Sequence, residues 1–131
     1  MREIKFRAKE IGSEGKWRVG DLHMTATKPH IHSLSNKYLI RIETVGQYTG
    51  LHDKNRKEIY EGDIIRSFDS KGEPIIHYLL YDNEEAGFVA ILKGSAKGDF
   101  GYGRCYQQWI TECEKEVIGN IHDNPELLKW K

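Results

Sequence analysis

The sequence predicts a mainly β protein, and three observations support this. Apolar and polar residues alternate with a period of two in short segments such as residues 4–8, IKFRA, as expected for strands with one buried face. Clusters of Gly, Asp, Asn and Ser separate these segments and favour turns. The chain has 131 residues, of which 38% are hydrophobic, enough for one domain with its own core.

The N-terminal part is predicted to begin with a hairpin. Residues 4–8 form its first strand, residues 12–15 its turn, and Trp17 and Val19 lie on its second strand. Residues 20–37 contain Pro29 and three His without a sustained period, so we expect a long loop with one short strand there. The alternation resumes in a further predicted strand, at Tyr38, Ile40 and Ile42.

The segment 45–65, VGQYTGLHDKNRKEIYEGDII, predicts two strands joined by a polar turn. The Asp53 carboxylate is expected to accept the amides of Lys54 and Asn55. Asn55 is the residue expected to take a positive φ, because after Gly it tolerates the left-handed region best. Gly62 interrupts the second strand, which predicts a bulge or a sharp corner.

The C-terminal half continues the strand pattern. Residues 70–74, SKGEP, form a predicted turn, and residues 75–81 and 88–92 are apolar enough for a buried hairpin. Residues 94–103 contain four Gly and predict a surface loop. Residues 106–117 have near-helical apolar spacing but are expected to be extended. A strand at 117–121 and a short helix starting at Asn124-Pro125-Glu126 follow.

Three segments also resemble a known family. Residues 1–8, MREIKFRA, the central segment 45–65 and residues 116–121, EVIGNI, are similar to the YopX family of small proteins carried by bacteriophages and prophages, which has no settled biochemical role. Members of this family often have Gly where this chain has Arg56.

The resemblance implies a more detailed fold. We expect a small five-stranded barrel of the Src-homology-3-like type, with extra N-terminal strands and a short C-terminal helix. The chain is expected to be one YopX-like domain over residues 1–131, in which residues 1–37 are the N-terminal hairpin and loop elaboration. Residues 38–131 then form the barrel core and the C-terminal helix.

Charge is unevenly distributed along the chain, although the net charge is zero. Residues 1–57 contain twelve Lys and Arg against six Asp and Glu, and residues 58–131 contain eight against fourteen. We favour pairing of the two halves within one fold over a basic surface that faces a polyanion. Head-to-tail association of opposite faces into a homo-oligomer is a third interpretation.

Localisation is predicted from what the chain lacks. Its longest apolar run, residues 75–81, is far shorter than the roughly 20 residues of a membrane span, and the N-terminus has no continuous apolar segment of a secretory signal. We therefore expect a protein of the bacterial host cytoplasm with no membrane partner. Cys105 and Cys113 are expected to be ordinary thiols there.

Two groups of residues contain side chains capable of catalysis or metal binding. His23, His30 and His32 include a His-x-His pair whose rings would share one face of a strand, with Asp21 in reach, yet exposed or hydrogen-bonded rings are favoured over a metal site. A second group of three carboxylates is favoured as structural over acid-base catalysis; it consists of Glu58, Glu61 and Asp63.

The predicted function is a phage- or prophage-encoded, non-enzymatic interaction module, with no catalytic residue, cofactor or metal, that binds a host or phage macromolecule. A protein partner is favoured over nucleic acid because the net charge is zero. One alternative is a nucleic-acid-binding small barrel using the three cations of the central turn, and another is a metal-dependent hydrolase using His30, His32 and carboxylates near Asp63. The candidate binding surface consists of Lys54, Arg56, Lys57, Glu61 and Asp63.

Overall fold

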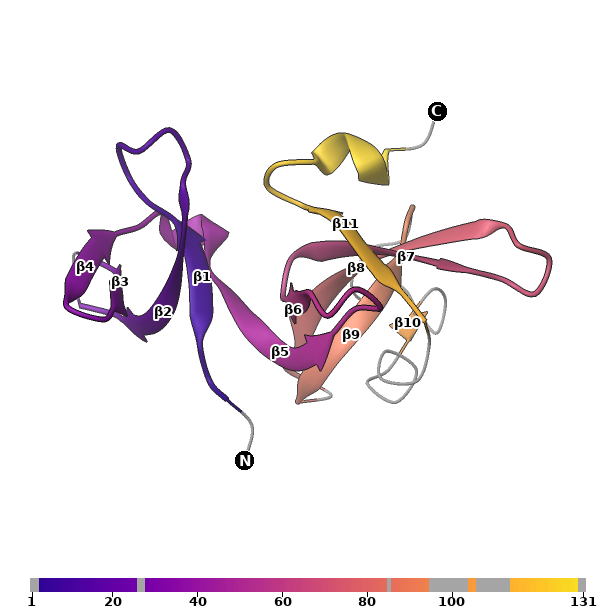
Figure 1. Ribbon diagram of the computed structural model, residues 1–131, viewed down its shortest axis with the longest axis horizontal. Helices are drawn as coiled ribbons and strands as arrows, with labels where there is room; N and C mark the ends of the chain where they lie inside the picture. Colours follow the sequence, from indigo (N-terminus) through magenta and orange to yellow (C-terminus); the bar gives the residue numbers. More distant parts are fainter. Residues whose placement is uncertain (1–2, 26–27, 85, 95–103, 106–113, 130–131) are drawn as a thin grey trace. The chain divides into compact units, whose positions relative to one another are not determined.

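The computed structural model consists of two compact units, residues 1–50 and 51–131. It describes residues 3–25, 28–84, 86–94, 104–105 and 114–129. Each unit contains antiparallel strands and its own cluster of buried apolar residues, and Figure 1 shows the elements along the chain. The division after Gly50 falls inside the segment that the sequence assigns to a barrel core.

A six-stranded sheet runs in the order β4-β3-β2-β1-β5-β6, and β1 to β4 and most of β5 belong to the first unit. A 3-10 helix, η1, precedes β5, which runs on to His52. The predicted N-terminal hairpin is confirmed, because Lys9 pairs with Trp17 and Arg7 with Val19. The elements of this unit are β1 (Phe6–Lys9), β2 (Trp17–His23), β3 (His30–Ser33), β4 (Asn36–Leu39), η1 (Ile42–Thr44) and β5 (Gly46–His52).

The long loop predicted at residues 20–37 is wrong for most of its length. β2 continues to His23, and β3 and β4 form a second hairpin in which His32 pairs with Lys37. These strands are short, so their pattern is too brief to read from sequence. The strand predicted through Ile42 ends earlier, because Ile42 begins the 3-10 helix.

Gly20 lies where β2 exchanges one partner strand for another. Its residues up to Gly20 pair with β1, and Asp21 to His23 pair with β3. A Cβ on Gly20 would lie 2.1 Å from the backbone oxygen of His32, so only glycine fits here. The close approach lets β3 pack Ile31 against the core of this unit, together with Ala8 and Ile40.

The second unit contains a five-stranded antiparallel sheet in the order β10-β9-β8-β7-β11. The predicted hairpin of two buried strands is confirmed by the pairing of β8 with β9. Ile59, Ile65, Leu79 and Ala90 form the buried core cluster of this unit. Its elements are β6 (Glu58–Tyr60), β7 (Asp63–Phe68), β8 (Pro74–Asp82), β9 (Gly87–Leu92), β10 (Arg104–Cys105), β11 (Glu116–Asn120) and a 3-10 helix, η2 (Pro125–Leu128).

The predicted corner at Gly62 is confirmed. Gly62 has φ +93° and lies in a turn between β6 and β7. Its amide donates to the Leu79 carbonyl at 2.7 Å, and its carbonyl accepts the Ile121 amide at 2.8 Å. The corner thus connects the start of β7 to β8 and to the end of β11.

Two details of the expected fold differ from the structure. Neither sheet closes into a barrel within the described residues, because each strand order has two distinct ends. The predicted C-terminal helix is one turn of 3-10 helix that starts at Pro125, too short for α-helical hydrogen bonding to propagate. The predictions for residues 95–103, 106–113 and Cys113 fall outside the described residues.

No helix among the described residues has the length and apolar character needed to cross a membrane.

Candidate functional site

The central turn is a five-residue hairpin loop closed by Asp53 and Lys57. The Asp53 amide donates to the Lys57 carbonyl at 2.8 Å, and the Arg56 amide donates to the Asp53 carbonyl at 3.0 Å. The Asp53 Oδ1 also accepts the amides of Asn55 and Lys57, at 2.8 and 2.9 Å. The predicted Asn55 contact is confirmed, whereas the Lys54 amide donates instead to the Lys115 carbonyl at 2.9 Å.

Arg56, and not Asn55, takes the left-handed conformation. Arg56 has φ +66°, and Asn55 is not among the residues with positive φ, so the prediction for Asn55 is wrong. In a hairpin built on a type I turn, the left-handed residue follows the two central turn residues. The position where family members often have Gly is therefore the one that requires a positive φ.

The same loop geometry occurs a second time in this unit, between β7 and β8. The Asp69 amide donates to the Glu73 carbonyl at 2.9 Å, and the Gly72 amide donates to the Asp69 carbonyl at 3.0 Å. Asp69 Oδ1 accepts the amides of Lys71 and Glu73. Here Gly72, with φ +82°, stands in the position that Arg56 occupies in the central turn.

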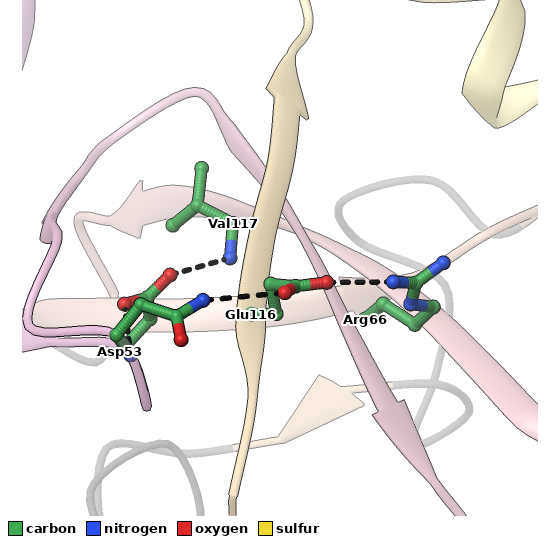
Figure 2. Close-up of polar contacts among 5 residues, drawn as sticks. Asp53, Arg66, Glu116 and Val117 are labelled. Carbon is green, nitrogen blue, oxygen red and sulfur yellow. Dashed lines mark hydrogen bonds and ion pairs between the residues drawn. The ribbon is translucent and has the colours of Figure 1, made fainter.

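Contacts with β11 distinguish the central turn from the second loop. Asp53 Oδ2 accepts the Val117 amide at 2.9 Å, so the carboxylate replaces a neighbouring strand's carbonyl at the edge of β11. Figure 2 shows this bond and the Arg66 Nη2 that donates to Glu116 Oε1 at 2.6 Å. The other Glu116 oxygen accepts Asn55 Nδ2 at 3.2 Å. Side-chain bonds thus connect the turn to β11 and β11 to β7.

These contacts shift two pKa values. Burial raises the pKa of Asp53, but the amides of Val117, Lys57 and Asn55 outweigh it and hold the pKa below its ordinary value. The hydrogen bond from Arg66 is the main cause that lowers the pKa of Glu116. Both groups are therefore stabilised as carboxylates, which suits anchoring and not proton transfer.

We define the basic tip as Lys54, Arg56 and Lys57, the three cations of the central turn. All three are exposed. Within the described residues, none of their side chains makes a hydrogen bond or an ion pair. The tip therefore presents three cationic side chains on a turn whose backbone is fixed by Asp53.

The two acidic residues of the predicted surface lie in different environments. Glu61 is half-buried, and its Oε2 lies 3.4 Å from the Tyr81 amide. Asp63 is only 1% exposed, and its Oδ2 accepts the Tyr60 amide at 2.7 Å. Asp63 therefore fixes the corner at Gly62 from inside, with almost none of its surface exposed.

A groove of about 420 Å³ lies beside the basic tip, at the ends of β7 and β11. It combines cations with apolar side chains, of which Phe68 is 55% exposed. No local sequence pattern predicts this groove, because its residues come from separate segments of the chain. They are Lys54, Arg66, Ser67, Phe68, Asp69, Ile75, Glu114 and Lys115.

The three histidines of the first unit come together on β2 and β3. The ring centroid of His32 is 3.8 Å from that of His23 and 4.7 Å from that of His30, and the rings are stacked. His30 Nδ1 lies 2.8 Å from the Lys28 carbonyl oxygen. Desolvation, followed by the charges of His23 and His30, lowers the pKa of His32.

No group of three His, Cys, Asp or Glu side chains that could hold a metal ion is found in the described part of the chain, because stacked rings do not direct their nitrogens to one point. His30 and His32 belong to the first unit, whereas Asp63, near which the joining carboxylates were expected, belongs to the second and is buried.

Comparison with known proteins places this arrangement in a family. Residues 5–129 match the family model described as YopX protein. The chain belongs to the YopX family. The match extends well beyond the three segments on which the resemblance was based, and it includes both units.

A solved structure resembles this YopX protein over nearly its whole length. The crystal structure of protein EF1440 from Enterococcus faecalis matches with a TM-score of 0.53 and 22% sequence identity, covering 98% of this chain and 100% of the other. At this identity the likeness concerns the fold alone. A search of curated proteins finds no match.

Proposed function

We propose that this YopX protein is a non-enzymatic interaction module that binds another protein through its basic tip. The single observation that supports the proposal is the tip itself, Lys54, Arg56 and Lys57, whose exposed cations make no ion pair within the described residues. The hydrogen bonds of Asp53 hold the turn backbone in one conformation. A rigid loop loses less conformational entropy on binding than a flexible one.

A protein partner suits the charge of the second unit better than nucleic acid does. Residues 51–131 contain eleven Lys and Arg against fifteen Asp and Glu, so a polyanion approaching the tip would meet a net negative unit. The family resemblance adds the proposed setting, a phage- or prophage-encoded protein acting in the bacterial cytoplasm. Self-association into a homo-oligomer is included, because a second copy is also a protein partner.

Capture of partners from bacterial lysate tests the proposal. Tagged full-length protein is compared with an Arg56→Gly/Lys57→Ser variant, which removes two tip cations while the glycine suits the left-handed backbone. The control, Lys28→Ser/Arg41→Ser, removes two exposed cations of the first unit. We expect mass spectrometry to identify a protein that the wild type and the control retain and the tip variant loses. Equal capture by all three would refute the proposed role of the tip.

A second candidate function rests on the cations of β1. Arg7 Cζ lies 4.8 Å from the centroid of the Trp17 ring, and Lys9 Nζ lies 5.6 Å from it. Cations combined with an aromatic ring are typical of surfaces that bind single-stranded nucleic acid. Salt-dependent binding of labelled single-stranded DNA at physiological ionic strength, lost in Arg7→Ser/Lys9→Ser, would favour this function over protein binding.

A further inference from the structure

Three histidine rings gather on one side of the junction between β2 and β3. His23 is paired with His30 across the two strands, and Asp21 is paired with His32, so these four side chains lie on the same side of the sheet. The ring centroid of His32 lies 3.8 Å from that of His23 and 4.7 Å from that of His30, and the other two centroids are 5.8 Å apart. We define His23, His30 and His32 as the histidine stack.

The junction that the stack covers is short. The register of β2 with β3 consists of three residue pairs, and two of these contain a member of the stack. The third pair, Leu22 with Ile31, points to the opposite side, where Leu22 packs against the core cluster that contains Ile31. On its outer side the junction is therefore held mainly by contacts of the stack.

The charged groups around the stack are mostly positive. β4 contributes Lys37, which is paired with His32. β1 contributes Arg7, whose partner Val19 lies on the same side of β2 as Asp21. His30 Nδ1 contacts the carbonyl of Lys28, a further cation. Among the charges that act on His32, that of Asp21 favours protonation, whereas those of Lys37 and the other two histidines oppose it.

A proton added to His32 would also lack a hydrogen-bond acceptor. Its Nε2 is buried and has no hydrogen-bond partner within the described residues. In a protonated imidazole both nitrogens carry a hydrogen, so this N–H would be buried and unpaired. Desolvation is accordingly the largest cause that lowers the pKa of His32. The stacked geometry thus suits neutral rings.

We propose that the histidine stack is a proton-operated switch, which keeps β2 paired with β3 while its rings are neutral and opens this pairing when they are protonated. Acidification places like charges on rings in contact, and these repel one another until the rings separate into water. β4 remains attached during the opening, because its Leu39 carbonyl accepts the Ile11 amide at 2.9 Å. The switch belongs to the first unit and is independent of the basic tip, which belongs to the second.

Amide hydrogen exchange of the full-length protein tests the switch. Exchange is followed by NMR at about pH 7.5 and about pH 5, on either side of the ordinary histidine pKa, and is corrected for the intrinsic effect of pH. We expect protection of residues 21–23 and 30–33 to fall at least about tenfold at the lower pH, whereas residues 6–8 and 18–19, in the pairing of β1 with β2, keep theirs. Unchanged protection at the junction, or an equal loss in both sets, overturns the proposal.

Two substitutions of exposed neighbours should act in opposite directions. Asp21→Asn removes the charge that favours protonation of His32, so the junction should lose roughly threefold more protection on acidification than in the wild type. Lys37→Gln removes a charge that opposes protonation, so the loss should be roughly threefold smaller. Both residues are exposed, and each variant is compared with itself at the higher pH. Changes of the same sign in the two variants would contradict the electrostatic mechanism.

His23→Gln tests the stack directly, because it replaces the ring that lies 3.8 Å from His32 with a side chain that stays neutral. His23 is exposed, and the variant should lose at most about threefold in protection on acidification. The control His52→Gln changes an exposed histidine outside the stack and should behave like the wild type. A wild-type loss in His23→Gln would show that the stack does not control the junction.

Discussion

At the scale of single residues, Arg56 is the position where sequence and backbone conflict. A non-glycine residue at φ +66° is held in the left-handed region at a cost of roughly 1–2 kcal/mol. The equivalent loop at Asp69 avoids this cost with Gly72. Because the Arg56 side chain is exposed and makes no hydrogen bond or ion pair within the described residues, folding alone does not explain why arginine is present.

Arg56→Gly is expected to stabilise the second unit by about 0.5–1 kcal/mol. Relief of the left-handed strain exceeds the additional entropy that glycine has in the unfolded chain. Native-state hydrogen exchange of β7 and β8 amides measures this unit separately from the first. The control Asn55→Gly should be destabilising, because it removes the bond from Asn55 Nδ2 to Glu116; the reverse order of the two variants would contradict the assignment of the turn.

At the scale of elements, the central turn protects the edge of a sheet. β11 is the last strand of the five-stranded sheet, and an open strand edge invites pairing with another chain. The Lys54 amide and the Asp53 carboxylate pair with the backbone of Lys115 and Val117. Further along, Asn124 Oδ1 accepts the Asn120 amide at 3.2 Å. Side chains and turns thus replace a neighbouring strand.

Asp53→Ala tests this role of the turn. The substitution leaves the amides of Asn55, Lys57 and Val117 without their acceptor, and we expect a loss of about 2–4 kcal/mol. Urea unfolding followed by circular dichroism measures the change.

Asp69 provides the matched control. Asp69→Ala removes the same two loop contacts from an exposed loop and should cost about 1 kcal/mol. The difference between the losses of unfolding free energy in the two variants measures what the Val117 contact and the burial of Asp53 contribute to stability. Equal losses would mean that the bond to β11 contributes nothing to stability.

At the scale of the whole molecule, two units of opposite charge are joined at Gly50. Residues 1–50 contain nine Lys and Arg against five Asp and Glu, and residues 51–131 contain eleven against fifteen. Both cores are formed by small clusters of fully buried apolar side chains. The second unit also buries an ionisable group, His77, which is 4% exposed on β8.

His77 should make the stability of the protein pH-dependent. Burial lowers its pKa from 6.5 to about 4, so the folded state keeps the ring neutral while the unfolded state takes up a proton below pH 6.5. The stability that depends on neutral His77 is therefore fully present above pH 6.5. It is lost as the pH falls to about 4, and the free energy of unfolding decreases over this range by up to about 1.4 kcal/mol per pH unit.

Urea midpoints between pH 8 and pH 4 measure this loss. His77→Gln should flatten the curve in that range, whereas His52→Gln, at an exposed histidine, should leave it as in the wild type. An unchanged slope in His77→Gln would show that other groups cause the pH dependence.

The sequence by itself determined those features of the fold that depend on neighbouring residues, namely hairpins, turns and a corner. The period of two identified the N-terminal hairpin, and two apolar runs identified the β8–β9 pair. The Asp53 side chain identified the turn and Gly62 the corner, since each depends on residues only a few positions apart. The same segments identified the YopX family.

Only the tertiary structure decided the contacts between distant segments. The amide of Val117 meets Asp53 across 64 residues, and the groove assembles Lys54, Ser67 and Glu114 from three segments. Local residues also suggested Asn55 as the left-handed position and Asp63 as a surface group, but the hairpin geometry placed the strain at Arg56 and packing buried Asp63. Such choices depend on which strands pair and which side chains lose contact with water, and neither is encoded within a short stretch of chain.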